Sequence, residues 1–124
     1  MLDQLTLELD KINQQQGVLG SLILTPDGMV VKSSVESEFD DEIISAMASS
    51  LTTTIRKSLD KLFCESFLFY TFSASKGDIL FINLDTAFLV ILVASGAPLS
   101  MIKIESIQIS QEIKNKLNLK TLDA

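Results

Sequence analysis

The chain contains no histidine, no tryptophan and only one cysteine, and these shortages remove whole classes of chemistry. Without histidine, neither a Ser-His-Asp triad nor a Cys–His pair can form. The single cysteine, Cys64, cannot make an internal disulfide, which fits a reducing cytoplasm. Its place at the apolar end of a helical pattern favours a small core residue over a reactive thiol. Only carboxylates remain as metal ligands, and the acidic run Asp40–Glu42 is better explained as a helix start.

Glycine and basic residues are too few or too scattered for two other functions. The five glycines never form GxxxxGKS/T or GxGxxG, so the chain has no phosphate-binding loop and is not itself a GTPase. Ten lysine and arginine residues are scattered along a chain of net charge -6, which argues against a nucleic-acid partner. We also find no pair of carboxylates placed for acid–base work. We therefore expect no catalytic residue, no metal and no cofactor, and a protein that is not an enzyme.

Long apolar runs are missing as well. No run approaches the roughly 20 residues that cross a bilayer, and the acidic N-terminal segment lacks the basic region of a secretory signal. We therefore expect a cytoplasmic protein without membrane insertion.

Apolar residues are nevertheless abundant in shorter stretches. Hydrophobic residues make up 47% of the 124 residues against 21% charged residues, and the mean hydropathy is +0.35. This length predicts a single domain over residues 1–124 with a substantial core. Because this hydropathy is high for so small a protein, we expect part of the apolar surface to meet another subunit.

The stretch 40–64 is the most regular part of the sequence and predicts a long helix. Its apolar residues recur at intervals of three and four, which places them on one stripe of a helix. Asp40 suits the N-cap, and Asp41 and Glu42 place negative charge in the first turn, where the helix dipole favours it. The apolar stripe comprises Ile44, Met47, Ala48, Leu51, Ile55, Leu59 and Leu62.

The opposite face of this helix carries small side chains where long charged ones would be ordinary. It comprises Ala46, Ser49, Ser50 and Thr53, followed by Lys57 and Asp60. Two interpretations are open: a solvated face that is rich in Ser and Thr, or a surface that a second helix or another protein approaches closely.

The remaining patterns predict two more helices and five strands. In the first helix the apolar face comprises Leu2, Leu5, Leu9 and Ile12, and the face expected in water comprises Asp3, Gln4, Glu8 and Lys11. Thr25–Gly28 places proline, aspartate and glycine in the order of a hairpin turn. The predicted strands are Val18–Leu24, Met29–Ser34, Ser66–Phe72, Ile79–Ile82 and Phe88–Val93, and a last helix begins near Leu99.

The order α-β-β-α-β-β-β-α predicts an α+β fold, in which a five-stranded antiparallel sheet has helices on both faces. The most apolar strands, Val18–Leu24 and Phe88–Val93, should be central, which gives the strand order 2-1-5-4-3. The aromatic strand Ser66–Phe72 is then an edge strand, and no charge, proline or bulge protects it.

We expect two copies to pair along this edge, which would give a homodimer with a continuous ten-stranded sheet and the two long helices side by side. The alternative is that a loop or the C-terminal tail covers the edge. The predicted dimer interface comprises Ala46, Ser49, Ser50, Thr53, Thr54, Phe67, Phe69 and Thr71.

The element order and several short motifs together resemble the Roadblock family of dynein light chains and its bacterial and archaeal relatives. The likeness covers nearly the whole chain, although each motif is weak alone. The motifs are Gly17–Ser21 before the first strand, Asp27-Gly28 in the hairpin, Asp41-Glu42 with Ala46 and Ala48 in the long helix, Leu89–Leu92, and Gly96–Leu99 at the last helix.

The resemblance implies a homodimeric or heterodimeric platform that binds a Ras-like small GTPase, and similar gliding-motility proteins look like activators of GTP hydrolysis. The residues expected to bind the GTPase are Thr53, Arg56, Lys57 and Asp60. Arg56 is the only arginine. It is a candidate arginine finger, although a solvated helix residue is far more common.

Two other functions are open. One is a structural subunit, similar to a motor light chain, that has no GTPase partner. The other is a sensor with a ligand cavity between sheet and helix. The sensor is disfavoured because the inward positions offer no convergent polar groups. These positions are Ile23, Ile44, Leu51, Ile91 and Val93.

Overall fold

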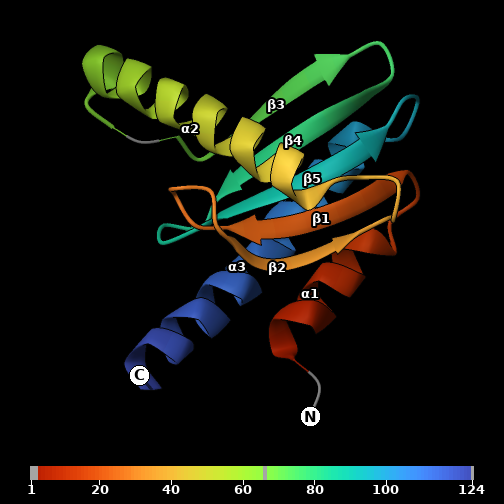
Figure 1. Cartoon of the computed structure of the whole chain (residues 1–124), viewed down its shortest axis with the longest axis horizontal. Coiled ribbons are helices and arrows are strands. Elements are labelled where there is room, and N and C mark those ends of the chain that lie inside the picture. The colour runs from red at the N-terminus through yellow and green to blue at the C-terminus, as the bar shows by residue number, and fades with distance from the viewer. Residues whose placement is uncertain (1–2, 66, 124) are drawn as a thin grey trace.

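The computed structural model describes the backbone of residues 3–65 and 67–123 and the side chains of residues 3–65 and 67–118. Helices and strands follow the predicted order (Figure 1). The helices are α1 (Gln4–Asn13), α2 (Asp41–Phe63) and α3 (Leu99–Asp123). The strands are β1 (Val18–Leu24), β2 (Val30–Val35), β3 (Phe69–Ala74), β4 (Gly77–Asn83) and β5 (Phe88–Ala94).

The five strands join one antiparallel sheet in the order β2-β1-β5-β4-β3, which confirms the predicted fold class and strand order. β5 is the central strand, and its residues from Phe88 to Val93 are all buried. α2 lies on one face of the sheet, and α1 and α3 lie on the other (Figure 1). β2 and β3 are therefore the two edges of the sheet.

The sheet supplies two separate cores, because successive side chains of a strand point to opposite faces. Leu89 and Ile91 of β5 pack in the core beneath α1 and α3. Phe88, Val90 and Leu92 of the same strand pack in the core beneath α2. Both faces of β5 are covered, which is why its sequence is a continuous apolar run.

α2 forms over the stretch that the sequence predicts. The Asp40 carboxylate caps it by accepting a hydrogen bond from the Glu42 N–H at 2.8 Å. Its 23 residues extend over about 35 Å at a rise of about 1.5 Å each. Strands spaced about 4.8 Å apart make a five-stranded sheet only about 19 Å wide. The C-terminal end of α2 therefore extends past the sheet (Figure 1).

This overhang makes two sequence predictions wrong. Leu62, assigned to the apolar stripe, lies in the last turn of α2 and has 71% of its surface exposed. Cys64, expected in the core, is exposed and closes the helix in the left-handed region with φ 56°. Periodicity alone indicates which side of a helix is apolar and not how far the sheet beneath it reaches.

β3 begins later than predicted. The predicted strand Ser66–Phe72 starts at a residue outside the described ones, and β3 itself begins at Phe69. Phe67 lies before the strand and is only 5% exposed, packed on Phe88 with ring centroids 5.6 Å apart. The Asn83 side chain donates a hydrogen bond to the Phe67 carbonyl at 2.9 Å, which holds this segment beside β4 without adding it to the ladder.

The prediction that Glu8 of α1 faces water is also wrong. Its side chain is 2% exposed, and its Oε1 accepts hydrogen bonds from Lys116 of α3 at 2.6 Å and from Lys11 at 3.0 Å. Burial opposes ionisation, but the hydrogen bonds from Lys116 and Lys11 and the positive charges of these lysines together outweigh it, and they lower the pKa of the carboxyl below its ordinary value. Leu2, predicted on the apolar face of the same helix, lies outside the described residues.

No helix within the described part of the chain has both the length and the apolar character needed to cross a membrane.

Candidate functional site

The face of α2 that points away from the sheet is open. Along its C-terminal half lies a hollow of about 530 Å³. The four residues predicted to bind a GTPase are all exposed and all line it. The hollow is lined by Thr53, Arg56, Lys57, Asp60, Cys64 and Glu65. The structure therefore brings the four predicted residues together on one surface of mixed charge.

Arg56 is positioned by a contact with the core of its own chain. The guanidinium carbon lies 5.8 Å from the centroid of the Phe88 ring, a cation–π contact. Phe88 stacks in turn on Phe67, so the aromatic pair beneath the arginine is fixed. This support limits the directions that the Arg56 side chain takes while its charge stays at the surface.

A second hollow, of about 540 Å³, continues along the N-terminal half of α2. Its lining includes five of the predicted dimer-interface residues and two residues of the β1–β2 turn that the sequence did not assign to a site. The lining comprises Asp27, Gly28, Ser45, Ala46, Ser49, Ser50, Thr53 and Thr54. Because Thr53 lines both hollows, they form one continuous surface, which we call the α2 outer face.

The β1–β2 turn reaches this surface because both partners are small. Gly28 has φ +92°, and a Cβ atom on it would lie 2.9 Å from the Ser49 Cβ. The small side chain of Ser49 is therefore already in contact within its own chain, because the β1–β2 turn packs against it. The hairpin motif and the small helix face are both visible in the sequence, but their contact depends on the tertiary fold.

The two edges of the sheet differ in protection. On β2, the Lys32 ammonium forms an ion pair with Asp3, and the Asn13 amide donates a hydrogen bond to the Ser34 carbonyl at 2.8 Å. β3 has the sequence FYTFSA, with no charged residue, and it pairs only with β4 among the described strands. Charge is a common protection of an edge strand, so β3 is the more open edge.

Of the interface residues predicted on β3, Phe69 is 41% exposed and Thr71 is half-buried. Phe67, also predicted in the interface, is buried in the core and does not lie on the edge. Tyr70 attaches the strand to α2, because its hydroxyl lies 3.1 Å from the Thr52 hydroxyl. Burial raises the pKa of Tyr70, against a smaller lowering by that hydrogen bond, so the phenol stays neutral.

Several large apolar side chains are exposed at the C-terminal end of α2 and from Leu68 through β3. They do not share one face, because the Lys103 ammonium of α3 lies 5.2 Å from the centroid of the Phe69 ring, whereas Phe72, three residues on, points to the other face of the sheet. We call this set the distal apolar cluster: Leu62 (71% exposed), Phe63 (65%), Leu68 (79%), Phe69 (41%) and Phe72 (51%). A group of this kind on one part of a small protein is typical of an interaction site. The sequence analysis predicted Phe69 as part of an interface and did not single out Leu68 or Phe63.

The α2 outer face offers protein contacts and little chemistry. Its titratable residues are all exposed: Asp27, Arg56, Lys57, Asp60, Cys64 and Glu65. In the part of the chain that the structure describes, no group of three His, Cys, Asp or Glu side chains could hold a metal ion. What remains is a rigid helix with small hydroxyl side chains and separated charges.

Comparison with known proteins agrees with this architecture. The sequence profile of the Roadblock/LC7 domain matches residues 4–95. The uncharacterized protein MJ0714 of Methanocaldococcus jannaschii is 26% identical over 114 residues, which cover 92% of this chain and 94% of that protein.

Among solved structures, Myxococcus xanthus MglB superposes with a TM-score of 0.85 at 12% identity, over 94% of this chain and 97% of MglB. A Roadblock/LC7 domain from Streptomyces avermitilis gives a TM-score of 0.79 at 14% identity, over 90% of this chain and 95% of that domain. At these identities the structures show a shared fold. Because the family profile spans α1, the whole sheet and α2, the chain belongs to the Roadblock/LC7 domain family.

Proposed function

We propose that this protein is a non-catalytic, homodimeric regulator or scaffold that binds a Ras-like small GTPase on its α2 outer face. The observation that carries the proposal is the gathering of Thr53, Arg56, Lys57 and Asp60 in one exposed hollow. The helix presents both positive and negative side chains, and Arg56 is held by its contact with Phe88. Such a surface suits recognition of a charged protein surface, where electrostatics give specificity. The family assignment agrees with this role, since the Roadblock resemblance implies a GTPase partner.

The homodimer is supported by β3 and by the overhang of α2. A two-fold axis beside the middle of β3, at its free edge, would continue the sheet into a second copy and place the end of each α2 over its partner. The distal apolar cluster would then be covered by the second copy. A contact of standard size buries about 1,600 Å² in total, and five large apolar side chains at the centre of such a contact are suitable anchors.

A cytoplasmic location is part of the proposal. Cys64 is exposed and has no disulfide partner in its own chain. In an oxidising compartment an exposed thiol of this kind would be open to pairing with a second molecule. A reducing compartment keeps it free.

The second candidate is a structural, light-chain-like subunit that uses the same surfaces and has no GTPase partner. The distal apolar cluster favours this candidate as much as the first, because an apolar surface also suits a permanent partner. The difference between the two lies in sensitivity to nucleotide.

The experiment is light scattering on a sizing column with the pure protein and Ras-like GTPases from the same genome. Each GTPase is loaded with GDP or with a GTP analogue. A complex that forms preferentially with one nucleotide state supports the regulator. A dimer that binds no GTPase in either state contradicts the regulator and supports the structural subunit.

Variants on the hollow sharpen this test. Asp60→Ala removes an exposed charge within the hollow and should weaken the complex, whereas Glu105→Ala on the exposed side of α3 should leave it unchanged. Arg56→Ala should retain any stimulation of GTP hydrolysis, because we assign Arg56 to binding. If Arg56→Ala abolished hydrolysis while binding persisted, Arg56 would act as an arginine finger instead.

A further inference from the structure

Charge is distributed unevenly along α2. Five acidic residues precede and begin the helix: Glu36, Glu38, Asp40, Asp41 and Glu42. Four of them are exposed and Asp41 is half-buried. None forms an ion pair with a residue that the structure describes. The helix N-terminus offsets part of this charge, but no lysine or arginine of the described chain pairs with the acidic segment, residues 36–42.

The other end of α2 carries an exposed pair of lysines. Lys57 and Lys61 are four residues apart, which places them on the same side of the helix. Neither is ion-paired within the described chain. Asp60 and Glu65 line the hollow with Arg56 and Lys57, so the two carboxylates offset part of the positive charge and leave this end of the helix net positive by one. The lysine pair is what gives this end of the helix its positive side.

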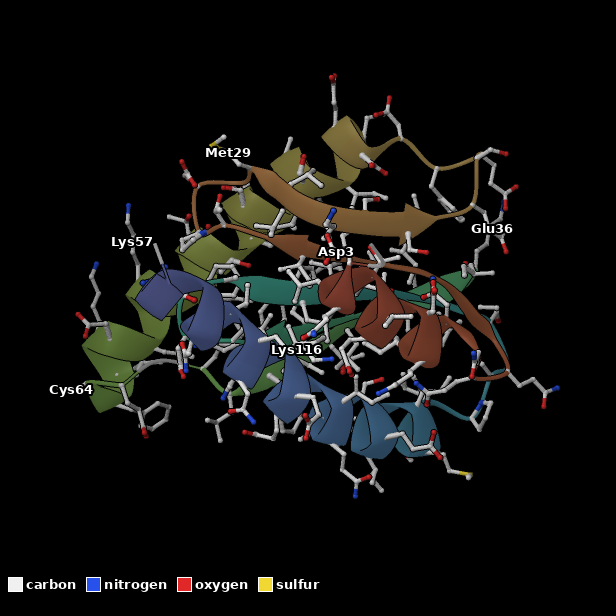
Figure 2. All side chains as sticks on the ribbon, turned by 90° about the horizontal axis from the view of Figure 1, so that it is seen from below. Asp3, Met29, Glu36, Lys57, Cys64 and Lys116 are labelled. Carbon is white, nitrogen blue, oxygen red and sulfur yellow. The ribbon has the colours of Figure 1, made fainter. Side chains whose placement is uncertain are left out.

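The two charged regions lie far apart within one copy. Glu42 and Lys61 are separated by about 29 Å along the helix, at a rise of about 1.5 Å per residue. Figure 2 shows Glu36 and Lys57 at opposite ends of the molecule. This separation exceeds the Debye length of about 8 Å at physiological ionic strength, so the two regions attract each other little within one copy.

A second copy brings them together. The two-fold axis that pairs β3 with β3 runs perpendicular to the strands and makes the two α2 helices antiparallel. Packed helices lie about 8–10 Å apart, so the acidic segment of each copy would lie near the lysine pair of the other. A parallel alignment would place like charges together at both ends. Charge and symmetry therefore favour the same arrangement.

We propose that the acidic segment of one copy docks beside Lys57 and Lys61 of a second copy, so that charge complementarity strengthens the antiparallel dimer. This inference rests on the proposed homodimer and names a charged contact within it. The symmetry of the β3 pairing sets the alignment, the distal apolar cluster supplies contact area, and the charges make that alignment electrostatically complementary. The same charges would discriminate against subunits with a different charge order.

The test uses two charge-reversed proteins of the full chain. In the first, Glu36→Lys, Glu38→Lys and Glu42→Lys leave only Asp40 and Asp41 against three lysines, which makes the acidic segment net basic. In the second, Lys57→Glu and Lys61→Glu make the basic side acidic. Either protein alone would place like charges at both ends of an antiparallel dimer. A mixture of the two would place opposite charges at both ends of a mixed dimer.

Sedimentation equilibrium measures the dimer dissociation constant of each protein and of the equimolar mixture. We expect each reversed protein to dimerise at least about tenfold more weakly than the original, and the mixture to return to within about threefold. The control Asp10→Lys with Glu105→Lys and Glu112→Lys changes the net charge by the same amount as the first reversed protein. Its changes lie on exposed positions of α1 and α3, across the sheet from α2, so it should dimerise normally. Rescue in the mixture also shows that both reversed proteins are folded.

The charge mechanism can also be tested on the original chain, without substitutions. The dimer of the original chain should dissociate more readily as salt rises from about 50 mM to about 500 mM, because salt screens exposed charges. If the original chain dimerises and both reversed proteins dimerise equally well, or if mixing fails to restore affinity, the charge mechanism is overturned while the dimer stands. If the original chain is a monomer, the proposed homodimer is itself wrong.

Discussion

Replacing Lys116 by methionine should destabilise the protein more than removing the carboxylate to which it is bound. Lys116 of α3 contacts Glu8 of α1 at 2.6 Å, and the Glu8 side chain is 2% exposed. Glu8 Oε2 has no hydrogen-bond partner among the described residues. The substitution Lys116→Met keeps an unbranched side chain of similar length and leaves a buried charge with one cation fewer.

The magnitude follows from the exposure of each partner. Breaking a buried ion pair by removing one side usually costs about 3–5 kcal/mol. Lys11 still contacts Glu8 at 3.0 Å but is 56% exposed, so it compensates in part, and we expect a loss of about 2–3 kcal/mol. Glu8→Met removes the buried charge, and both lysines reach water along their flexible stems, so its cost should stay below about 1.5 kcal/mol.

Urea unfolding at one fixed protein concentration measures these losses, because the concentration sets the contribution of any dimer. The double variant Glu8→Met with Lys116→Met should have nearly the same unfolding free energy as Glu8→Met alone, because without Glu8 the lysine has no partner to lose. The reasoning is refuted if Lys116→Met is no more destabilising than Glu8→Met, or if the two losses simply add. Either result would mean that Glu8 is not a buried charge that depends on Lys116.

Three further predictions concern the pH dependence of Glu8, the β3 edge and the β1–β2 turn. The pKa of Glu8 is lowered from 4.5 in the folded protein. Its contribution to stability is therefore present above pH 4.5 and is lost as the pH falls through the lower pKa of the folded state. The difference in unfolding free energy between the original chain and Glu8→Met should shrink over this range of pH. Phe69→Asp should produce monomer or aggregate on a sizing column, whereas Val30→Asp, at a similarly exposed position (43%) on the protected edge, should leave the dimer intact. Gly28→Ala should cost about 1–2 kcal/mol in chemical unfolding, because its φ of +92° and the nearby Ser49 both oppose a Cβ atom; an unchanged midpoint would contradict that packing.

The parts of the fold that were predictable depend on local pattern. The continuous apolar runs of β1 and β5 identified the centre of the sheet, and the Asp40 cap identified the start of α2. The aromatic strand was correctly placed at an edge. Each of these features is encoded within a few residues, because burial on both faces and helix capping leave signals in the adjacent sequence.

The parts that were wrong depend on distant residues or on the size of other elements. Glu8 was predicted to face water because its main partner, Lys116, lies 108 residues away on α3. Cys64 was predicted to be a core residue because the local sequence pattern does not indicate where the sheet beneath α2 ends. Phe67 was placed on the edge strand because an aromatic run looks the same whether its first member turns into the core or continues the ladder.

The structure also explains why interaction should concentrate on one side of the molecule. Each of the two sheet faces is covered by helix, and the β2 edge is covered by Lys32, Asp3 and Asn13. In the α1–α3 layer, the buried Glu8 is paired internally with Lys116. By contrast, β3 has no charged residue of its own, and the acidic segment at the other end of α2 forms no ion pair within the described chain. In the proposed homodimer, one two-fold operation would cover the β3 edge and the overhang of α2 and would bring the acidic segment of each copy near the lysine pair of the other.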